Sequence, residues 1–327
     1  MHSKPPPPPV EPSFDAILLV SFGGPEGPDD VMPFLENVTR GKPVPRERLL
    51  AVAEHYHHFG GKSPINDHCR ELIAALRAEL RDNGVDLPIY WGNRNWHPLL
   101  PDTLSQMQRD GVQRAVAVFT SAFSSYSGCR QYQENIAAAQ AEVGHGAPRV
   151  DKVRPFFHHP GFLHAVTERT REAVAALPED QRAGAHFLFT AHSIPNAMAA
   201  TCAYEKQLAE ASRLVAEAVG AGSFELVYQS RSGPPQVPWL GPDIVDHLPD
   251  VAARGVSAVV VVPIGFLSDH VEVLWDLDEE AREKAQALGL GFARAGTVGT
   301  HPAFVAALCE LVQERLIEST EAIVAPR

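Results

Sequence analysis

Six short apolar runs recur along this chain, and longer amphipathic segments separate most of them. Two of the separating segments, at 67–84 and 204–222, have the periodicity of helices. Strands that are apolar along their whole length, with helices between them, are typical of a parallel sheet covered on both faces. We therefore predict an α/β fold. The expected strands are AILLV (16–20), PIYWG (88–92), AVAVF (115–119), HFLFT (186–190), ELVYQ (225–229) and AVVVVP (258–263).

The two halves of the sequence carry similar short motifs in the same order. The matching pairs are LLVSFGGP (18–25) with LFTAHSIP (188–195), DGVQRAVAVFTSAFSS (110–125) with ARGVSAVVVVPIGFLSD (253–269), and HPGF (159–162) with HPAF (301–304). This repetition predicts two similar α/β lobes that face each other across a cleft. The expected divisions are a proline-rich tail (1–13), an N-terminal lobe (14–160), a C-terminal lobe (161–300) and a C-terminal helix (301–327) that packs back on the first lobe.

Charge and hydropathy limit the classes of function. The 327 residues carry a formal net charge of −12, so binding to nucleic-acid phosphates is not expected. No stretch approaches the roughly 20 apolar residues of a membrane span. The opening MHSKPPPPPVEPS also lacks the apolar centre of an export signal. We expect a cytoplasmic protein without an integral membrane segment.

The cysteines stand far apart in the sequence and form no CxxC pair. They are Cys69, Cys129, Cys202 and Cys309. Dispersed thiols in a chain of this kind are usually reduced and partly buried. We therefore expect neither disulfides nor a closed zinc site.

Two potential metal ligands follow expected strands of the second half. His192 follows the strand at 186–190, and its imidazole offers a lone pair to a metal or a proton. The alternative is a histidine that only hydrogen-bonds its own loop. Glu272 begins the helical segment after the strand at 258–263, so its carboxylate can face the same crevice, beyond the carboxyl ends of the strands. One imidazole and one carboxylate suit a divalent ion such as Fe(II), and they also form a base for a weakly acidic N–H. We predict catalytic and metal-binding roles for both residues.

Asp276 and Glu280 continue the acids from Glu272 at a spacing of four residues. On a regular helix this spacing forms one stripe of like charges, which costs some helix stability. Apolar residues such as Leu277 are interleaved with them. We predict that the stripe conducts protons or hydrated cations; the alternative is a solvated charged face.

The segment HYHHFGGKSP (55–64) is also rich in potential metal ligands. Its three histidines cannot all converge on one ion, because only residues three or four apart share a helix face. We expect Gly60 and Gly61 to end the helix, and Lys62 and Ser63 to offer a cation and a hydroxyl group to an anionic ligand.

The segment SSYSGCRQYQENI (124–136) joins an expected strand to an expected helix. Its Ser127, Arg130 and Tyr132 could hold a carboxylate or stack on a planar ligand. GGPEGP (23–28) lacks the GK[ST] ending of a phosphate loop, so no nucleotide is expected.

Several of these segments together resemble the ferrochelatases, in particular the coproporphyrin ferrochelatases of actinobacterial type. The resemblance extends from about Phe14 to about Leu316. The segments that carry it are LLVSFGGPEGPDDVMPFLENVTRG, FGGKSPIN, SYSGCRQY, FTAHSIP, YQSRSGPPQVPWLGPD and PIGFLSDHVEVLWDLDEEA. The combination of AHSIP with SDHVEVLWDLD is the most specific part.

The resemblance implies two Rossmann-like lobes of the class II chelatase type, with a porphyrin held between them. It places the metal-binding histidine and glutamate of the family on His192 and Glu272, and its acidic ladder on Asp276 and Glu280. Its tetrapyrrole contacts fall on Ser63 and on Tyr132, the latter after a one-residue gap, and the region that handles propionates contains Arg40, Lys42 and Arg46. We also expect Phe22 and Trp275 to form apolar walls against the ring.

The chain departs from the family pattern at two points. Phe22 stands where some relatives have a tyrosine that can touch iron from the face opposite His192, and a phenyl ring cannot coordinate a metal. Many actinobacterial members also carry an iron–sulfur cluster on C-terminal cysteines. The ending RLIESTEAIVAPR has none, and Cys309 alone cannot supply four thiolates. We therefore expect no iron–sulfur cluster and no cofactor beyond the substrate Fe(II).

The expected activity is insertion of Fe(II) into coproporphyrin III with release of two protons. We expect a monomer that hands its product to a downstream enzyme of haem synthesis. Coproporphyrin is preferred to protoporphyrin IX on the resemblance, not on any single residue. Two competing interpretations are a cobalt or nickel chelatase acting on sirohydrochlorin and a non-catalytic haem carrier.

Overall fold

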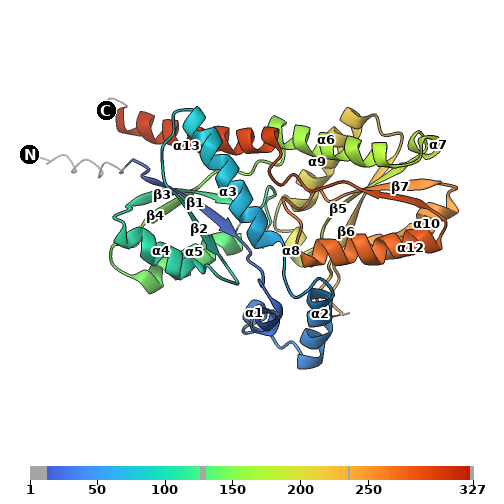
Figure 1. The fold of residues 1–327 in the computed structure, drawn as a ribbon, viewed down its shortest axis with the longest axis horizontal. Coiled ribbons are helices and arrows are strands. Elements are labelled where there is room, and N and C mark those ends of the chain that lie inside the picture. The colour runs from blue at the N-terminus through green and yellow to red at the C-terminus, as the bar shows by residue number, and fades with distance from the viewer. Residues whose placement is uncertain (1–12, 126–129, 235, 325–327) are drawn as a thin grey trace, which may run out of the picture.

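The computed structural model describes residues 13–125, 130–234 and 236–324. Two four-stranded parallel sheets form its body, one in each half of the chain (Figure 1). The first sheet has the order β2-β1-β3-β4, with β1 (Ala16–Ser21), β2 (Ile89–Asn93), β3 (Arg114–Phe119) and β4 (Arg149–Lys152). The second has the order β6-β5-β7-β8, with β5 (His186–His192), β6 (Phe224–Gln229), β7 (Ala258–Val262) and β8 (Gly291–Arg294). The predicted fold class, α/β with two similar lobes, is confirmed.

The two sheets have the same strand order, which agrees with the two similar lobes that the sequence repeat predicted. All six expected strands form, and their bounds shift by a residue or two. Strands β4 (RVDK) and β8 (GFAR) were missed. Each lies at the edge of its sheet and is only four residues long, so it needs no continuous apolar run.

Most helices before residue 150 lie around the first sheet or project beyond it. A short 3-10 turn (Pro28–Asp30) precedes α1 (Val31–Val38), α2 (Arg46–His58), α3 (Ile65–Asp82), α4 (Leu100–Arg109) and α5 (Gln131–Val143). The next helix, α6 (Pro160–Ala176), contacts β7 and β8 of the second sheet. Helices α1 and α2 project from the body of the molecule (Figure 1). Their apolar cluster is built on Phe34 and Tyr56, and it also includes Phe22, just after β1, and Val271 of the second half. The projecting helices therefore connect the two lobes near the ends of their central strands.

The second half contains more helical segments, several of them short. They are α7 (Glu179–Arg182), α8 (Asn196–Ala199), α9 (Tyr204–Val219), α10 (Ile244–Ala253), α11 (Val271–Val273), the π-helix Leu274–Ala281, α12 (Arg282–Ala287) and α13 (Pro302–Val324). As expected, the helix before Gly60 and Gly61 ends there, because both glycines have positive φ angles.

Helices α6 and α13 begin at the repeated HPGF and HPAF motifs. Nδ1 of His159 and Nδ1 of His301 each accept a hydrogen bond from the backbone N–H two residues on, so each histidine caps its helix. Nε2 of His159 lies 3.3 Å from Glu310 of α13, and Nε2 of His301 lies 3.1 Å from Glu168 of α6. The two helices therefore contact each other reciprocally.

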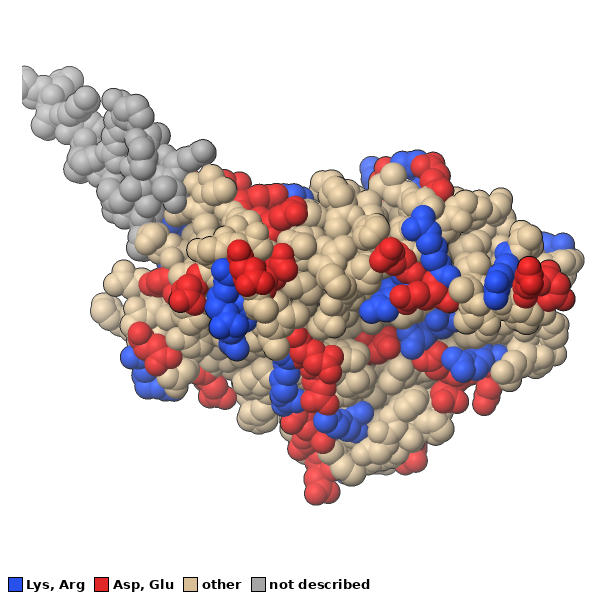
Figure 2. Space-filling view, turned by 45° about the horizontal axis from the view of Figure 1, so that its top comes forward, with Lys and Arg blue, Asp and Glu red and all other residues tan. Residues whose placement is uncertain are grey.

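The largest apolar core is shared by both halves of the chain. It contains Leu19 of β1 and Phe189 of β5, together with Leu76 of α3, Phe162 of α6 and Phe304 of α13. Within the part of the chain that the structure describes, no helix is long and apolar enough to cross a bilayer. On the face shown in Figure 2, blue Lys and Arg side chains alternate with red Asp and Glu.

Candidate functional site

The carboxyl ends of two central strands place His192 and Glu272 near each other. His192 is the last residue of β5, and Glu272 lies in α11, which follows β7 after a loop. Nε2 of His192 is 4.0 Å from Oε2 of Glu272. A divalent ion with metal–ligand bonds of about 2.1 Å could bridge two atoms at this separation. The structure thus brings together the two residues that the sequence singled out first.

The hydrogen bond of His192 determines which ring nitrogen is available. Its Nδ1 lies 2.5 Å from the carbonyl oxygen of Ser193. A carbonyl oxygen can only accept, so Nδ1 carries the hydrogen, and Nε2 of the neutral ring has the free lone pair. The Tyr204 hydroxyl group also donates to the His192 carbonyl oxygen at 3.1 Å and fixes the end of β5. His192 therefore presents a lone pair on the side of Glu272.

The acids after Glu272 lie on a π-helix rather than on one regular α-helix. Residues Leu274–Ala281 form this π-helix between α11 and α12. Hydrogen bonds from i to i+5 widen the turn, so residues four apart are no longer directly above one another. The expectation of a regular stripe is wrong in this respect. No residue in LWDLDEEA signals the change.

Asp276 is the half-buried member of the acidic series. Its Oδ2 accepts hydrogen bonds from the Ser230 hydroxyl group and, at 3.2 Å, from Nε2 of Gln229. Burial raises the pKa of Asp276 to about 7; the carboxylates of Glu272 and Glu280 also raise it, whereas the Ser230 hydrogen bond lowers it. Asp276 can therefore take up and release a proton near neutral pH.

Ser230 was not predicted from the sequence. Its φ angle is 59°, and it is the non-glycine residue with positive φ among those that the structure describes. Such a conformation is uncommon for serine, and here it accompanies the hydrogen bond to Asp276. Its place directly after the strand at 224–229 was the signal that could have found it.

Trp275 of the π-helix contacts histidines of the projecting helix α2. The His55 ring stacks on it with a centroid distance of 3.9 Å, and the His58 ring meets it edge-on at 5.5 Å. Nε2 of His58 is 3.4 Å from Oε1 of Glu279. Burial lowers the pKa of His55, which favours its neutral ring. One face of Trp275 is thus covered by His55.

Phe22 and Tyr132 of the first lobe share one guanidinium group. The Arg94 guanidinium carbon lies 4.6 Å from the centre of the Tyr132 ring and 5.6 Å from that of Phe22. Nε of Arg94 donates to Oδ1 of Asn135 at 2.7 Å. Sequence reasoning missed Arg94, although its position directly after β2, where strand ends converge, could have identified it. These contacts bring two of the predicted substrate residues together.

Ser63 is buried, and Lys62 is already paired. The Ser63 N–H donates to the Pro25 carbonyl oxygen at 2.9 Å, so Ser63 lies against the loop that follows β1. Nζ of Lys62 is 2.5 Å from the Asp67 carboxylate. Lys62 is thus paired within the protein, and its predicted contact with an anionic ligand stays a prediction.

The remaining predicted residues lie on the projecting helices or near residue 130. Arg40 is exposed just after α1, and Nη1 of Arg46 lies 3.4 Å from Glu36 at the surface. Arg130 pairs with Glu134 at 3.1 Å. Ser127 lies outside the described residues, so its predicted role stays a prediction.

The described residues contain no group of three or more His, Cys, Asp or Glu side chains arranged to hold a metal ion. His192 and Glu272 therefore supply only part of a coordination shell. Such a pair suits an ion that passes on to other ligands more than an ion that stays.

Comparison with known proteins gives a consistent result. The ferrochelatase family model matches residues 14–316. A protein of Rhodopirellula baltica described as ferrochelatase is 60% identical over 93% of this chain and 87% of its own length. A coproporphyrin III ferrochelatase of Nocardia farcinica is 56% identical over 93% of this chain and 89% of its own.

Solved structures support the fold alone. SirB from Bacillus subtilis with Fe3+ aligns with a TM-score of 0.57 at 13% identity and covers 93% of this chain and 96% of its own. The sirohydrochlorin chelatase SirB in complex with cobalt gives a TM-score of 0.54 at 12% identity, over 94% and 95%. At these identities the likeness concerns the two-lobe architecture and not the substrate.

Proposed function

The chain belongs to the ferrochelatase family, and from this premise we propose that it inserts Fe(II) into coproporphyrin III. The product is iron coproporphyrin, and two protons leave the macrocycle, in a lyase-class step of haem synthesis. Relatives named coproporphyrin III ferrochelatase, at 52–56% identity over most of the chain, support the choice of substrate.

The single observation that carries the proposal is the 4.0 Å separation of His192 and Glu272. The free lone pair on Nε2 of His192 can accept a proton from a pyrrole N–H or bind the incoming ion. Glu272 neutralises the positive charge that either event brings. The two side chains are close enough to act on the same pyrrole N–H or the same ion.

A flat porphyrin keeps its four nitrogens in one plane, and two of them carry protons. Bending the ring exposes lone pairs and N–H bonds, at a cost on the order of a few kcal/mol that binding of the remote carboxylates can offset. Arg40 and Arg46 are the proposed partners of those carboxylates. Ser63, Tyr132 and Phe22 are the proposed contacts of the ring.

Released protons need a route to solvent. Asp276, with a pKa of about 7, is suited to accept them next, and exposed Glu280 can pass them to water. We propose this route for protons, and for hydrated Fe(II) in the opposite direction.

The central test compares His192→Ala and Glu272→Gln with the unchanged protein. Each variant is incubated anaerobically with Fe(II) and coproporphyrin III, and insertion is followed by absorbance. Insertion is expected to fall by roughly 10²–10⁴-fold, the range for loss of a general acid–base group. Porphyrin binding, titrated at the Soret band without metal, is expected to persist. His57→Ala, an exposed histidine of α2, is the matched control.

Normal turnover in His192→Ala overturns the assignment. Parallel reactions with protoporphyrin IX and sirohydrochlorin decide the substrate. Faster insertion into either of these than into coproporphyrin III contradicts the proposal. Tight haem binding without insertion by the unchanged protein indicates a carrier.

We also propose that the protein works without an iron–sulfur cluster. Cys309, the last cysteine of the sequence, is buried in α13, and Cys69 is buried elsewhere. Iron and acid-labile sulfide, measured after anaerobic purification, are expected to be well below one cluster per chain. A stoichiometric cluster contradicts this.

The proposed setting is the cytoplasm, with the protein acting as a monomer that hands its product to a later enzyme. Light scattering after size-exclusion chromatography is expected to give the mass of one chain, 35.5 kDa. A mass of twice that value refutes the monomer.

A further inference from the structure

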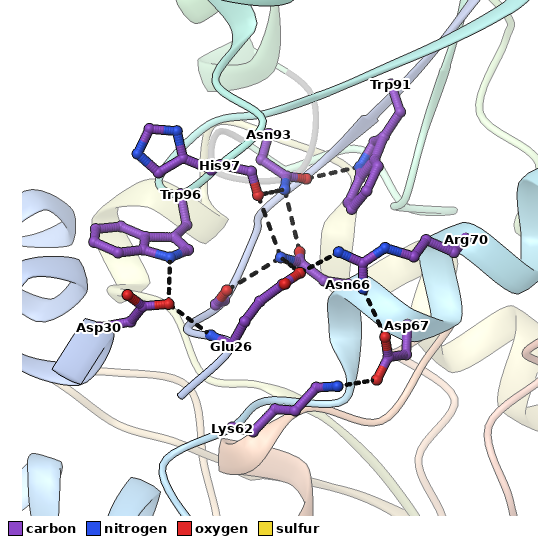
Figure 3. A network of polar contacts seen from close by, with 11 residues as sticks. Glu26, Asp30, Lys62, Asn66, Asp67, Arg70, Trp91, Asn93, Trp96 and His97 are labelled. Carbon is purple, nitrogen blue, oxygen red and sulfur yellow. Dashed lines mark hydrogen bonds and ion pairs between the residues drawn. The ribbon is translucent and has the colours of Figure 1, made fainter. Parts of the chain in front are cut away.

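Two fully buried asparagines meet at the carboxyl edge of the first sheet. Asn66 lies in the first turn of α3, and Asn93 is the last residue of β2; both have 0% exposure. Figure 3 shows them at the centre of a polar network that joins three loops. One loop follows β1, the second precedes α3 and the third follows β2. Burying two amides is costly unless each polar atom is paired, so the network calls for an explanation.

The Asn66 side chain contacts two of the other loops directly. Its Nδ2 is within hydrogen-bond distance of the Gly24 carbonyl oxygen (3.2 Å), Oε1 of Glu26 (2.9 Å) and the His97 carbonyl oxygen (3.2 Å). An amide nitrogen has only two hydrogens, so three acceptors share them. One side chain thus connects α3 to the loop after β1 and to the loop after β2.

Asn93 completes the network from the sheet. Its Nδ2 donates to Oδ1 of Asn66 at 3.1 Å and to the His97 carbonyl oxygen at 3.0 Å. Its Oδ1 accepts from Nε1 of Trp91 at 2.9 Å. The indole can only donate and the carbonyl can only accept, so the orientation of both amides is fixed. Figure 3 shows both amide groups directed at the His97 carbonyl oxygen.

The backbone and the charged rim reinforce the same junction. Glu26 and Lys62 form an isolated antiparallel bridge between the loop after β1 and the loop before α3. Arg70 of α3 contacts both Glu26 and Asp67. A Cβ atom at Gly24 would lie 2.7 Å from Cβ of Ser63, so the loops touch without space for a side chain.

The loops that the network joins carry the proposed ring contacts. Ser63 belongs to the loop before α3. The Phe22 carbonyl oxygen accepts from the Asn95 N–H at 3.0 Å, which ties the end of β1 to the loop after β2. Arg94, which touches Phe22 and Tyr132, is the residue after Asn93.

We propose that Asn66 and Asn93 are positioning residues that hold Ser63, Phe22 and Arg94 in the arrangement that binds the tetrapyrrole. Neither asparagine touches the substrate; each acts through the loops. The inference rests on the proposed function. It predicts a defect in porphyrin binding without a defect in metal use, because His192 and Glu272 stand on the other lobe.

The test uses Asn66→Ala, Asn93→Ala and the double variant. Asn83→Ala is the matched control, because Asn83 lies at the opposite end of α3 and bonds a backbone carbonyl, Glu79. Coproporphyrin III binding is titrated without metal, and KM for porphyrin and for Fe(II) is measured separately. All measurements are made well below the unfolding temperature of each variant.

Each single variant is expected to raise the porphyrin Kd and KM by roughly tenfold, the equivalent of one or two lost hydrogen bonds. In these variants, KM for Fe(II) is expected to stay within about twofold of the value for the unchanged protein. In Asn83→Ala, the porphyrin Kd and both KM values should also stay within about twofold. The double variant is expected to lose less than the product of the two single effects, because the residues share one network. Asn66→Ser, which keeps a hydroxyl donor, recovers part of the binding and replaces Asn66→Ala if the latter does not fold.

If Asn66 and Asn93 only stabilise the fold, a different result is expected. The variants would then unfold at lower temperature but bind porphyrin normally while folded, and that result overturns the inference. Equal increases of KM for porphyrin and Fe(II) overturn it as well. If the unchanged protein neither binds nor metallates porphyrin, the proposed function itself fails.

Discussion

Replacing Asp276 by asparagine tests the electrostatic account of the π-helix. The carboxyl group is half-buried, accepts hydrogen bonds from Ser230 and Gln229, and lies near the carboxylates of Glu272 and Glu280. Burial, with a contribution from these charges, raises its pKa from 3.8 to about 7. Asparagine has nearly the same shape and keeps an oxygen that can accept from Ser230, but it never becomes charged.

The sign of the effect follows from linkage. A carboxyl group whose pKa is higher in the folded state binds protons more tightly there than in the unfolded chain. Its contribution to stability is complete below about pH 4 and is lost as the pH rises through about 7. Within that window, each increase of one pH unit lowers the free energy of unfolding by about 1.4 kcal/mol. Between about pH 5.5 and about pH 8.5, Asp276 should therefore lower the free energy of unfolding by about 2 kcal/mol.

Urea unfolding of the two proteins at these pH values measures the effect. The difference in free energy of unfolding, Asp276→Asn minus the unchanged protein, should be about 2 kcal/mol larger at the higher pH. Groups that do not interact with Asp276 titrate identically in both proteins and cancel. A difference that is the same at both pH values, within error, refutes the raised pKa and with it the proposed proton acceptor. Insertion by Asp276→Asn should also lose its dependence on a group that titrates near pH 7.

Two further predictions concern stability. Gly161→Ala is expected to destabilise the protein by about 1–3 kcal/mol, because the new Cβ would press on the backbone of α13 and lie 2.9 Å from Cβ of Ala307. The control Gly222→Ala, where the space is open, should change stability little. Thermal unfolding measures both variants, and equal effects contradict the close helix contact. Burial raises the pKa of Glu225, but hydrogen bonds from His247 and Arg254 outweigh it and hold the pKa at about 2. Glu225→Gln is therefore expected to cost about 2 kcal/mol at neutral pH and much less near pH 2, as seen by urea unfolding; a cost independent of pH contradicts this pairing.

Local patterns were enough for the architecture. Buried central strands need apolar residues along their whole length, and AVAVF and AVVVVP show this directly. Edge strands such as β4 and β8 are half-exposed, so short polar runs suffice and leave no pattern to read.

The proximity of His192 and Glu272 also followed from sequence. His192 ends one strand, Glu272 follows the loop after another, and the carboxyl ends of strands in one parallel sheet converge. Arg94 also lies at the carboxyl end of a strand, directly after β2. It was not predicted, because nothing in WGNRNWHP shows which aromatic rings its guanidinium group contacts.

The sequence by itself determined the two lobes, their central strands and the candidate metal ligands, because strand burial and strand ends are local properties of the chain. Only the tertiary structure decided the π-helix, the His55–Trp275 stack and the Asn66–Asn93 network. The physical reason is that hydrogen-bond partners and stacked rings are selected by distances between segments far apart in the chain. An asparagine or a histidine has the same identity in the sequence whether its partner is water, a carbonyl oxygen or an indole.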